Sequence, residues 1–335
     1  MHVVAAPDTF RGTASAAAVA AAVARAAARA GWTVDEVPVA DGGEGTLDVL
    51  GGPNRTTTVT GPLGDAVLAS WRAGSRTAVV ELARASGLEL VGGPEGNDPV
   101  AATSSGTGEL VAAAVDAGCR RVLVGVGGSA STDGGLGAVR ALEPLARLRG
   151  VELVVACDVR TRFVDAAAVF APQKGASAAQ VELLRRRLER LADVYLHSYG
   201  VDVRPLEGSG AAGGLAGGLA AIGARLVPGF DLVADEVDLA DRLEDADLVV
   251  TGEGFLDEQS FQGKVVGGVA TLAAAAGVPV LAVVGEVLEG VAVPPGIEVA
   301  SLVEAVGPAR ARAETEAAVE DVVAARLTHP KSERR

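Results

Sequence analysis

Short apolar runs alternate with longer helical patterns along most of the chain. Seven of these runs predict strands, and six of the seven are mostly apolar, as parallel strands are when helices cover both faces of their sheet. The run at 34–39 contains Asp35 and Glu36, so we expect that strand at a sheet edge. The alternation of strands and helices predicts an α/β fold with parallel strands. The seven predicted strands are residues 3–6, 34–39, 122–126, 153–156, 248–251, 280–284 and 299–303.

One region breaks this alternation and predicts a second domain. Residues 55–60, 66–73 and 77–82 are strand-like, and the turns between them are too short for crossover helices. They predict an antiparallel meander and therefore a mixed sheet. We expect a mixed-sheet α/β domain at 51–239, inserted into a doubly wound domain formed by 1–50 and 240–335. The glycine-rich segment 208–218 fits either side of the second boundary.

Composition and charge narrow the classes of function. Hydrophobic residues make up 49% of the chain, yet no purely apolar run reaches about 18 residues, which predicts a soluble globular protein. The first residues reach Asp8 before a signal-peptide core could form, so we expect a cytoplasmic protein, with a frayed tail at 329–335. The formal charge of −14 argues against nucleic acid or an anionic membrane as a partner. Cys119 and Cys157 are too few for a disulfide framework or a zinc site.

The histidines narrow the chemistry further. The chain has three, His2, His197 and His329, and none lies in a glycine-rich loop. This argues against Ser-His-Asp hydrolysis and histidine-rich metal sites. Catalysis is therefore expected to use carboxylates, lysines, backbone amides and a hard cation.

Glycine, carboxylate and hydroxyl residues gather in seven loops at the ends of predicted strands. In open α/β sheets, ligands bind beyond the carboxyl ends of the strands, where glycine lets backbone N–H groups approach an anion. One such loop is weak support, because glycine also serves plain turns, but seven favour a ligand cleft, placed between the two domains. The loops are APDTFRGT (6–13), ADGGEGT (40–46), SSGTGE (104–109), GVGGSASTDGG (125–135), ACDV (156–159), GSGAAGG (208–214) and TGEGFLDEQSFQGK (251–264).

Two nucleotide-binding motifs compete as explanations of these loops. A Walker motif needs Ser or Thr after Gly-Lys, but Val265 follows Lys264 and Gly175 follows Lys174, which argues against a P-loop. The segment GVGGSA, residues 125–130, does satisfy GxGxxA after a predicted strand, so a dinucleotide-dependent oxidoreductase stays an alternative. Its ribose-binding acid would have to be Asp158, which lies further along the chain than is usual.

The scarcity of lysine points to function. Only three of the 29 basic residues are lysines, namely Lys331 in the tail and Lys174 and Lys264 beside glycines in loops. A compact ammonium acts as a point charge on a phosphate, which a planar guanidinium fork does not replace. We therefore favour phosphate contacts for Lys174 and Lys264 over chance retention.

The loop acids have both chemical and structural interpretations. Asp41 and Glu44 flank two glycines and are placed to share Mg²⁺, although Glu44 fits equally well as a cap of the next helix. Asp158 follows a buried strand, which suits either a general base of fixed geometry or a turn aspartate. Glu253 and Asp257 occupy a similar loop at a strand end.

The loops resemble, in order, the motifs of the bacterial glycerate kinases of type I, which phosphorylate D-glycerate with ATP. The resemblance runs from about residue 3 to about residue 285. It implies a flavodoxin-like domain with a mixed-sheet insert, ATP and Mg²⁺ as cofactors, and D-glycerate or a similar hydroxy acid as the acceptor, with 2-phosphoglycerate as the product. Phosphoryl transfer depends on positioning and charge neutralisation, which suits a chain of this composition. The motifs are APDTFRGT, PVADGGEGT, SSGTGEL, GVGGSASTDGG, ACDV, AVFAPQKGA, GSGAAGG and DLVVTGEGFLDEQSFQGK.

The resemblance also implies roles for individual residues. Asp158 is expected to orient or deprotonate the acceptor hydroxyl. Arg11 is expected to hold the acceptor carboxylate and Asp8 its hydroxyls, with Lys174 at the phosphates. The expected substrate- and phosphate-binding residues are Gly127, Gly128, Ser129, Asp133, Ser209, Gly210, Asp257 and Lys264, and the expected Mg²⁺ ligands are Asp41, Glu44 and Glu253. For Asp133, a plain cap of the following helix is the alternative.

Several positions depart from the family pattern, which makes this a shortened and divergent member. The family has lysine at Arg11, arginine at Phe255, a tyrosine near Ser104 and a longer loop after Asp158. The segment between residues 135 and 151 is also short. These departures predict either an altered acceptor or, as the alternative, a ligand-binding relative without turnover. The oligomeric state stays open, a homodimer included.

Overall fold

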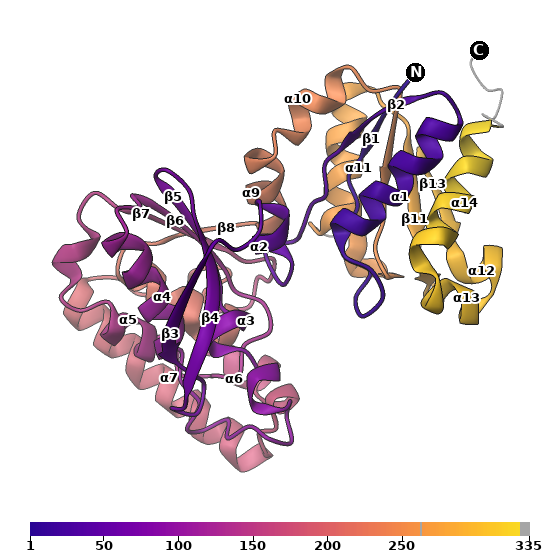
Figure 1. The fold of residues 1–335 in the computed structure, drawn as a ribbon. Coiled ribbons are helices and arrows are strands. Elements are labelled where there is room, and N and C mark those ends of the chain that lie inside the picture. The colour runs from indigo at the N-terminus through magenta and orange to yellow at the C-terminus, as the bar shows by residue number, and fades with distance from the viewer. Residues whose placement is uncertain (262, 329–335) are drawn as a thin grey trace. The chain divides into compact units, whose positions relative to one another are not determined.

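The computed structural model describes residues 1–261 and 263–328 and divides into two compact units (Figure 1). Unit 1 consists of Met1–Asp41 and Phe230–Arg335, and unit 2 of Gly42–Gly229. The sequence-based limits lie further along the chain at both boundaries, at 50/51 and 239/240. None of the helices in the described residues is long and apolar enough to cross a bilayer. Lys331, His329 and the predicted frayed tail lie outside the described residues.

Unit 1 is built on a five-stranded parallel sheet with the order β13-β11-β9-β1-β2. Numbered along the unit, this order is 2-1-3-4-5, which is that of flavodoxin-like doubly wound folds. β2 lies at one edge, as its charged residues predict, and β13 lies at the other. The strands are β1 (His2–Ala5), β2 (Thr33–Glu36), β9 (Leu248–Thr251), β11 (Val280–Val284) and β13 (Ile297–Ser301), with β10 (Phe255–Leu256) and β12 (Glu286–Val287) as a separate parallel pair.

Helices cover both faces of this sheet. Successive side chains of a strand point to opposite faces, and Leu281 packs with α1 and α14 whereas the neighbouring Ala282 packs with Val266 of α11. Both residues are buried, so β11 lies inside the unit. The helices are α1 (Ala16–Arg29), α9 (Gly229–Glu236), α10 (Leu239–Glu244), α11 (Val265–Ala276), α12 (Leu302–Val306), α13 (Pro308–Ala313) and α14 (Thr315–Thr328), with the 3₁₀ turn η5 (Glu258–Phe261).

Two predicted strands in unit 1 differ from the structure at their ends. The strand predicted at 34–39 ends at Glu36, although the N–H groups of Val37 and Val39 still donate to the carbonyls of Ala5 and Pro7 at 2.8 and 3.0 Å. The strand predicted at 299–303 ends at Ser301, where α12 begins. Ser301 caps that helix, since its hydroxyl accepts from the N–H of Glu304 at 3.3 Å. A capping signal inside the apolar run therefore decides where the strand stops.

Unit 2 contains a six-stranded mixed sheet with the order β3-β4-β5-β6-β7-β8. Strands β3, β4 and β5 are antiparallel neighbours, which confirms the predicted meander, and β5 to β8 are parallel. Gly-Pro-Leu-Gly and Gly-Ser supply the turns, leaving no room for a helix between these strands. The strands are β3 (Arg55–Thr60), β4 (Ala66–Ala73), β5 (Thr77–Glu81), β6 (Arg121–Gly125), β7 (Glu152–Ala156) and β8 (Arg225–Val227).

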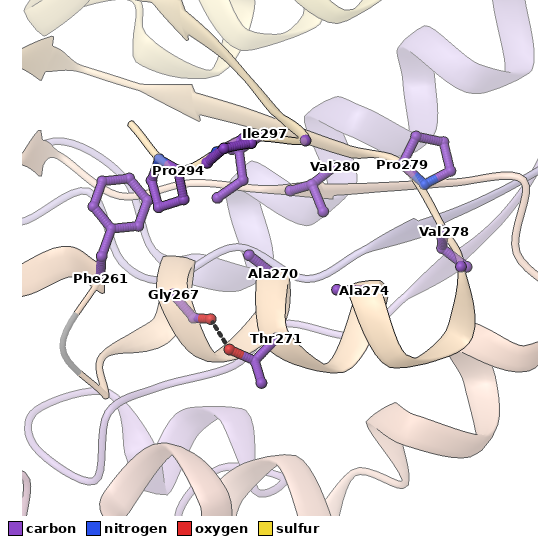
Figure 2. Close-up of a pocket in the computed structure, with 13 residues that line it drawn as sticks. Phe261, Gly267, Ala270, Thr271, Ala274, Val278, Pro279, Val280, Pro294 and Ile297 are labelled. Carbon is purple, nitrogen blue, oxygen red and sulfur yellow. Dashed lines mark hydrogen bonds between the residues drawn. The ribbon is translucent and has the colours of Figure 1, made fainter. Parts of the chain in front are cut away.

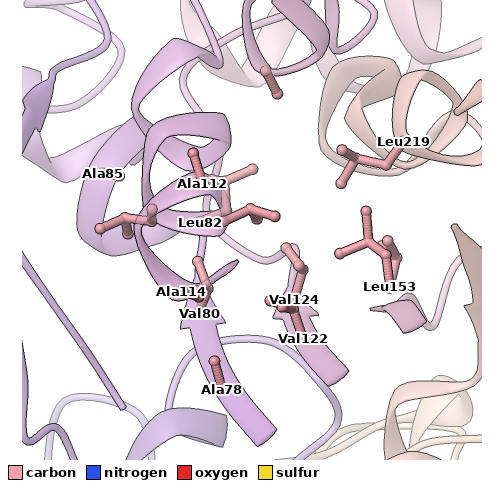
Figure 3. Close-up of a cluster of buried hydrophobic side chains, with 14 of the residues drawn as sticks. Ala78, Val80, Leu82, Ala85, Ala112, Ala114, Val122, Val124, Leu153 and Leu219 are labelled. Atoms are coloured by element: carbon pink, nitrogen blue, oxygen red, sulfur yellow. The ribbon is translucent and has the colours of Figure 1, made fainter. Parts of the chain in front are cut away.

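The main core of unit 2 lies between this sheet and helices α4 and α8. Figure 3 shows alternate residues of β5 and β6, among them Val80 and Val124, pointing toward Leu82 and Ala112. These side chains are buried, and a fully buried valine or leucine contributes about 1.5–3 kcal/mol. The helices of unit 2 are α2 (Thr46–Val49), α3 (Ala83–Ser86), α4 (Ser105–Asp116), α5 (Leu136–Ala141), α6 (Ala166–Phe170), α7 (Ala178–Tyr199) and α8 (Leu215–Ala221), with the 3₁₀ turns η1 (Glu89–Val91), η2 (Leu145–Leu148), η3 (Pro172–Lys174) and η4 (Ala211–Gly214).

The long helix α7 forms a second core and supports a loop. It starts with a capping box between Ser177 and Gln180 and ends at Gly200, whose φ of +73° suits glycine. Its buried stripe includes Leu184 and Tyr195. The Tyr195 hydroxyl donates to the carbonyl of Gly134 at 2.9 Å, so α7 fixes the glycine-rich loop after β6.

Candidate active site

In unit 1, two of the predicted loops meet at the point where the strand order reverses. The strands β1 and β9 are neighbours, and the chain leaves β1 toward β2 on the opposite side, which makes their carboxyl ends a topological switch point. The N–H of Asp8 donates to the carbonyl of Gly252 at 2.8 Å, and the Thr251 hydroxyl donates to the carbonyl of Ala6 at 2.8 Å. The loops 6–13 and 251–264 are therefore joined where a ligand is expected.

This switch point carries a cluster of carboxyl groups. Burial raises the pKa of Asp8 to about 8, and the charges of Asp41 and Glu253 raise it further, whereas the N–H of Thr9 and the charge of Lys264 oppose the rise. Burial also raises the pKa of Glu253. In the described part of the chain, Oε1 of Glu253 is buried and has no hydrogen-bond partner. Holding buried carboxylates close together is unfavourable, and such clusters are typical of sites that bind a cation.

The donor set of this cluster fits Mg²⁺. Carboxylate oxygens are its preferred protein ligands, and one or two of them suffice because waters and substrate phosphates complete the octahedron. Among residues 1–261 and 263–328, no group of three or more acidic, histidine or cysteine side chains is arranged to hold a metal ion by itself. Glu44, a predicted ligand, belongs to unit 2, so its relation to Asp41 and Glu253 stays a prediction. It directly precedes Gly45, the N-cap residue of α2.

Asp257 and Lys264 differ in their interactions within the protein. Asp257 is part of a turn, because its Oδ1 accepts from the N–H of Ser260 at 3.0 Å and its N–H donates to the Ser260 hydroxyl at 2.9 Å. This is a structural role that the sequence-based expectation of ligand binding does not include. Lys264 is half-buried at the start of α11, where its charge opposes the pKa rises of Asp8 and Glu253.

In unit 2, two glycine-rich loops and the loop that follows β7 approach one another at the carboxyl ends of β6 and β7. A Cβ at Gly42 would lie 2.7 Å from Cβ of Ala156 and 2.7 Å from Cα of Gly229. A Cβ at Gly127 would lie 2.9 Å from Cα of Gly43. Such separations are too short for any side chain, so only glycine permits this packing. The loops 42–46, 125–135 and 156–159 thus come together as predicted from their composition.

The amide groups of two predicted phosphate-binding segments are used differently. In the described residues, no protein group accepts a hydrogen bond from the N–H of Gly127, Gly128 or Ser129, which leaves them available to an anion. The N–H of Ser209 donates to the carbonyl of Leu206, and that of Gly210 to the carbonyl of Thr161. The Ser209 hydroxyl also donates to the carbonyl of Leu206, at 2.6 Å. The predicted anion cradle at Ser209 and Gly210 is therefore corrected to a structural turn.

Lys174 occupies an interior position that the sequence does not predict. Only 3% of it is exposed, and its ammonium donates to the hydroxyl of Ser129 and to the carbonyl of Ser131, both at 2.6 Å. Burial lowers its pKa to about 7, and the charge of Asp133 opposes this. A side chain so enclosed cannot act as an exposed point charge on a phosphate. We therefore reassign it as a positioning residue that fixes the loop carrying Ser129.

This position of Lys174 predicts a pH-dependent stability. Its pKa is about 7 in the folded protein and 10.5 when unfolded, so between these values the unfolded chain holds the additional proton and unfolding becomes less favourable as pH rises. The free energy of unfolding of the wild type, compared with that of Lys174→Met, should therefore increase by several kcal/mol from pH 7 to pH 10. Urea unfolding at both pH values measures this difference. An equal difference at pH 7 and pH 10 would contradict the assignment.

Asp133 organises the same loop through four hydrogen bonds. Its Oδ2 accepts from the N–H and hydroxyl of Ser104 at 2.9 and 2.8 Å and from the N–H of Gly137 at 3.1 Å. Its Oδ1 accepts from the N–H of Gly135 at 3.0 Å. The structural alternative, a cap of the helix that follows, is what the geometry shows. Asp133 thereby ties the loop 104–109 to the loop 125–135.

Asp158 follows β7 in the loop that leads to α6. One of its carboxylate oxygens accepts from the N–H of Gly229 at 2.6 Å. The N–H of the preceding Cys157 donates to the carbonyl of Val227 at 2.9 Å, so the backbone before Asp158 is anchored to β8. The carboxylate is half-buried and held in one orientation, which agrees with the turn interpretation and leaves the general-base role a prediction.

Glu81 is a site-supporting residue that the sequence analysis does not single out. It ends β5, is 2% exposed, and its Oε1 accepts from the N–H of Leu47 at 2.7 Å. Its Oε2 pairs with Nε of Arg84 at 3.2 Å. Burial raises the pKa of Glu81, and the Leu47 N–H and Arg84 oppose this. A glutamate that ends an apolar strand is the sequence signal that could have identified it.

The dinucleotide alternative does not fit this geometry. The GxGxxG/A fingerprint requires a helix to begin within the motif, with the pyrophosphate at its N-terminus. After Gly125 the chain continues as a loop, and α5 begins only at Leu136 and ends at Ala141. The glycines instead serve the close packing of loops.

An apolar pocket in unit 1 lies outside these clusters (Figure 2). It has a volume of about 660 Å³ and extends along α11 to the first residues of β11 and β13. Most of the residues that line it have apolar side chains, and the hydroxyl of Thr271 already donates to the carbonyl of Gly267 at 2.8 Å. None of the lining residues has a charged side chain, so this pocket is not the candidate anion site.

The carboxylate cluster of unit 1 and the glycine-containing loops of unit 2 lie at the carboxyl ends of parallel strands, which is where open α/β folds bind their ligands. The sequence model of the glycerate kinase family matches residues 3–145 and 142–327. The chain belongs to the glycerate kinase family, which places it among the kinases.

Individual relatives agree over most of the chain. It is 40% identical to a glycerate kinase of Bacillus subtilis, with 86% of this chain and 85% of the relative covered. It is 38% identical to glycerate 2-kinase of Escherichia coli, with 88% and 87% covered. The solved structure of a protein assigned as glycerate kinase 2 from Salmonella typhimurium LT2 matches with a TM-score of 0.81 and 34% identity, covering 97% of this chain and 98% of that one.

Proposed function

We propose that the protein transfers the γ-phosphoryl group of ATP to a hydroxyl of D-glycerate. The observation that carries this proposal is the carboxylate cluster of Asp8, Asp41 and Glu253 at the switch point of unit 1, in a chain of this family. Phosphoryl transfer needs a divalent cation to neutralise the phosphates, and this cluster suits one. The name of the Escherichia coli relative, glycerate 2-kinase, supports the 2-hydroxyl as the acceptor.

In this proposal Mg²⁺ would be held by Asp41 and Glu253, with Asp8 beside them, and would neutralise charge on the phosphates of ATP. Lys264 is the nearby cation, and it offsets part of the negative charge before the ligand binds. The unpaired N–H groups of Gly127, Gly128 and Ser129 bind anionic oxygens. Lys174 holds this loop in place through its hydrogen bonds to the Ser129 hydroxyl and the Ser131 carbonyl.

The acceptor step follows from the fixed carboxylate of Asp158. Asp158 takes the proton of the acceptor hydroxyl while the hydroxyl oxygen bonds to the γ-phosphorus and the bond between that phosphorus and ADP breaks. A base held in one orientation by the Gly229 N–H acts without reorganising. Arg11 is exposed in the loop of Asp8 and stays a proposed contact for an anionic ligand. The sequence-based domain limits and the cleft between the domains stay predictions.

The assay for this proposal is ADP release from ATP and Mg²⁺ with D-glycerate and a panel of other hydroxy acids. We expect turnover that depends on D-glycerate and is abolished by a chelator of divalent cations. Thermal stabilisation by ATP or D-glycerate without any product would instead identify a ligand-binding relative. The absence of both turnover and stabilisation would reject the proposal.

A further inference from the structure

The loop that follows Asp158 carries two arginines without partners. Arg160 and Arg162 are both exposed, and in the part of the chain that the structure describes neither forms an ion pair or a side-chain hydrogen bond. Many other arginines of this acidic protein are engaged, as Arg204 is with Asp202 at 2.8 Å. Two unpaired guanidinium groups within four residues of a candidate base form a concentrated positive charge in a chain of net charge −14.

The backbone of this loop is held although it has no regular secondary structure. The N–H of Gly210 donates to the carbonyl of Thr161, between the two arginines, at 2.9 Å. A Cβ at Gly210 would lie 2.4 Å from the carbonyl oxygen of Arg162, so the 208–210 turn packs directly against the loop. Phe163 is fully buried, with its ring 6.1 Å from that of Tyr195. The segment that presents Arg160 and Arg162 is therefore anchored in its middle and at its end.

The loop with Arg160 and Arg162 also leaves the sheet at the carboxyl end of β7, next to the end of β6. Ala156, the last residue of β7, pairs with Gly125, the last residue of β6, and adjacent strands lie about 4.8 Å apart. The loop with the unpaired amides thus starts beside the loop with the arginines. The nearby acids are Asp165 and Glu207, both exposed and without an ion pair to either arginine in the described residues.

We propose that Arg160 and Arg162, rather than Arg11, bind the carboxylate of the acceptor and select a 2-hydroxy acid over neutral polyols. This inference rests on the proposed function and deepens it. In a 2-hydroxy acid the carboxylate and the reacting hydroxyl sit on adjacent carbons, so the cation that binds the one lies close to the base that serves the other. Arg160 meets this condition, being two residues from Asp158 on one anchored loop. A guanidinium fork also matches the two oxygens of a carboxylate.

The test compares Arg160→Gln, Arg162→Gln and the double variant with Arg149→Gln as the matched control. Arg149 is exposed and without an ion pair in the described residues, and it precedes β7 at the opposite end of the same strand. We expect the KM for D-glycerate to rise about tenfold or more in each single variant and further in the double variant, because each loses a charge-assisted hydrogen bond. The KM for ATP should stay within about twofold of the wild-type value in every variant. In Arg149→Gln the KM for D-glycerate should do the same.

A neutral substrate analogue separates carboxylate recognition from general damage. The wild type should strongly prefer D-glycerate to D-glyceramide, in which an amide replaces the carboxylate, and the double variant should lose that preference with the constants for the amide unchanged. Arg160→Lys should recover part of the lost affinity, since it keeps the charge without the fork. Unchanged KM for D-glycerate, or a rise in the KM for ATP instead, would overturn the inference.

Failure of the proposed function gives a different pattern. If the wild type releases no ADP with any acceptor, calorimetric titration with D-glycerate and D-glyceramide still tests the arginines. Binding of the acid that the double variant loses and Arg149→Gln keeps would support the inference. Equal binding of acid and amide to the wild type, or no binding of either, would overturn it.

Discussion

Replacing Asp8 by asparagine is expected to lower kcat/KM for D-glycerate by about a hundredfold or more while making the ligand-free protein more stable at alkaline pH. The loss of activity follows because the cluster loses a carboxylate beside the proposed cation ligands Asp41 and Glu253, a change that preorganised charge makes costly. The gain in stability follows because burial and like charge raise the pKa of Asp8 to about 8. A site that costs stability when empty is typical of a functional cluster.

The sign of the stability effect can be derived from the pKa of Asp8. Its carboxyl has a pKa of 3.8 when unfolded and about 8 when folded, so between these values the folded protein holds the additional proton. The stability that this group contributes is present below pH 4 and is lost as the pH rises through 8. Asp8→Asn removes this dependence, so its advantage over the wild type should grow to several kcal/mol at pH 9. Urea unfolding at pH 5 and pH 9 measures it.

A control carboxylate distinguishes this effect from a general reduction of negative charge. Asp241 is exposed on α10, and Asp241→Asn should leave both the stability and kcat/KM near those of the wild type. If Asp8→Asn keeps full activity, or is no more stable than the wild type at pH 9, the cluster is not the strained cation site described above.

Replacing Asp158 by asparagine is the second change with a large expected effect. We expect kcat to fall by about 10²–10⁴-fold, the range that a positioned general base supplies, with a smaller change in the KM values. The amide oxygen of asparagine still accepts from the N–H of Gly229, so the turn and the free energy of unfolding should change little. Steady-state kinetics together with urea unfolding measure both quantities.

Asp165→Asn is the matched control for Asp158→Asn, because it removes an exposed carboxylate at the end of the same connection. It should leave kcat within about twofold. If Asp158→Asn retains kcat within tenfold, Asp158 is a turn aspartate and the proton is removed elsewhere.

The fold was largely predictable because its strands are short apolar runs with glycine-rich turns between them. The meander at 55–82 is an example, since no helix fits in its turns, and the structure places β3 and β4 where the pattern does. The strands that escaped prediction, β8, β10 and β12, have only two or three residues each, which is too short to carry a pattern. The end of β13 was misplaced because Ser301 caps a helix whose first residues are as apolar as a strand.

The candidate site was predictable in its loops and less so in its individual roles. Composition indicates which loops approach a ligand, and the structure brings several of them together within each unit. Burial is a tertiary property that composition does not reveal, so Lys174 could not be recognised as an interior residue that supports Ser129. The sequence also does not show which backbone N–H groups already have an acceptor within the protein. For this reason Ser209 and Gly210 were predicted to bind an anion, although both N–H groups donate to carbonyls.

The most direct test of the account is a proton-coupled ³¹P NMR spectrum of the protein incubated with ATP, Mg²⁺ and D-glycerate. Phosphate on the 2-hydroxyl is bonded through oxygen to a carbon with one hydrogen and gives a doublet, whereas phosphate on the 3-hydroxyl gives a triplet. The account predicts ADP and a new doublet in equal amounts. A spectrum that shows unchanged ATP, or only ADP with inorganic phosphate, would contradict it.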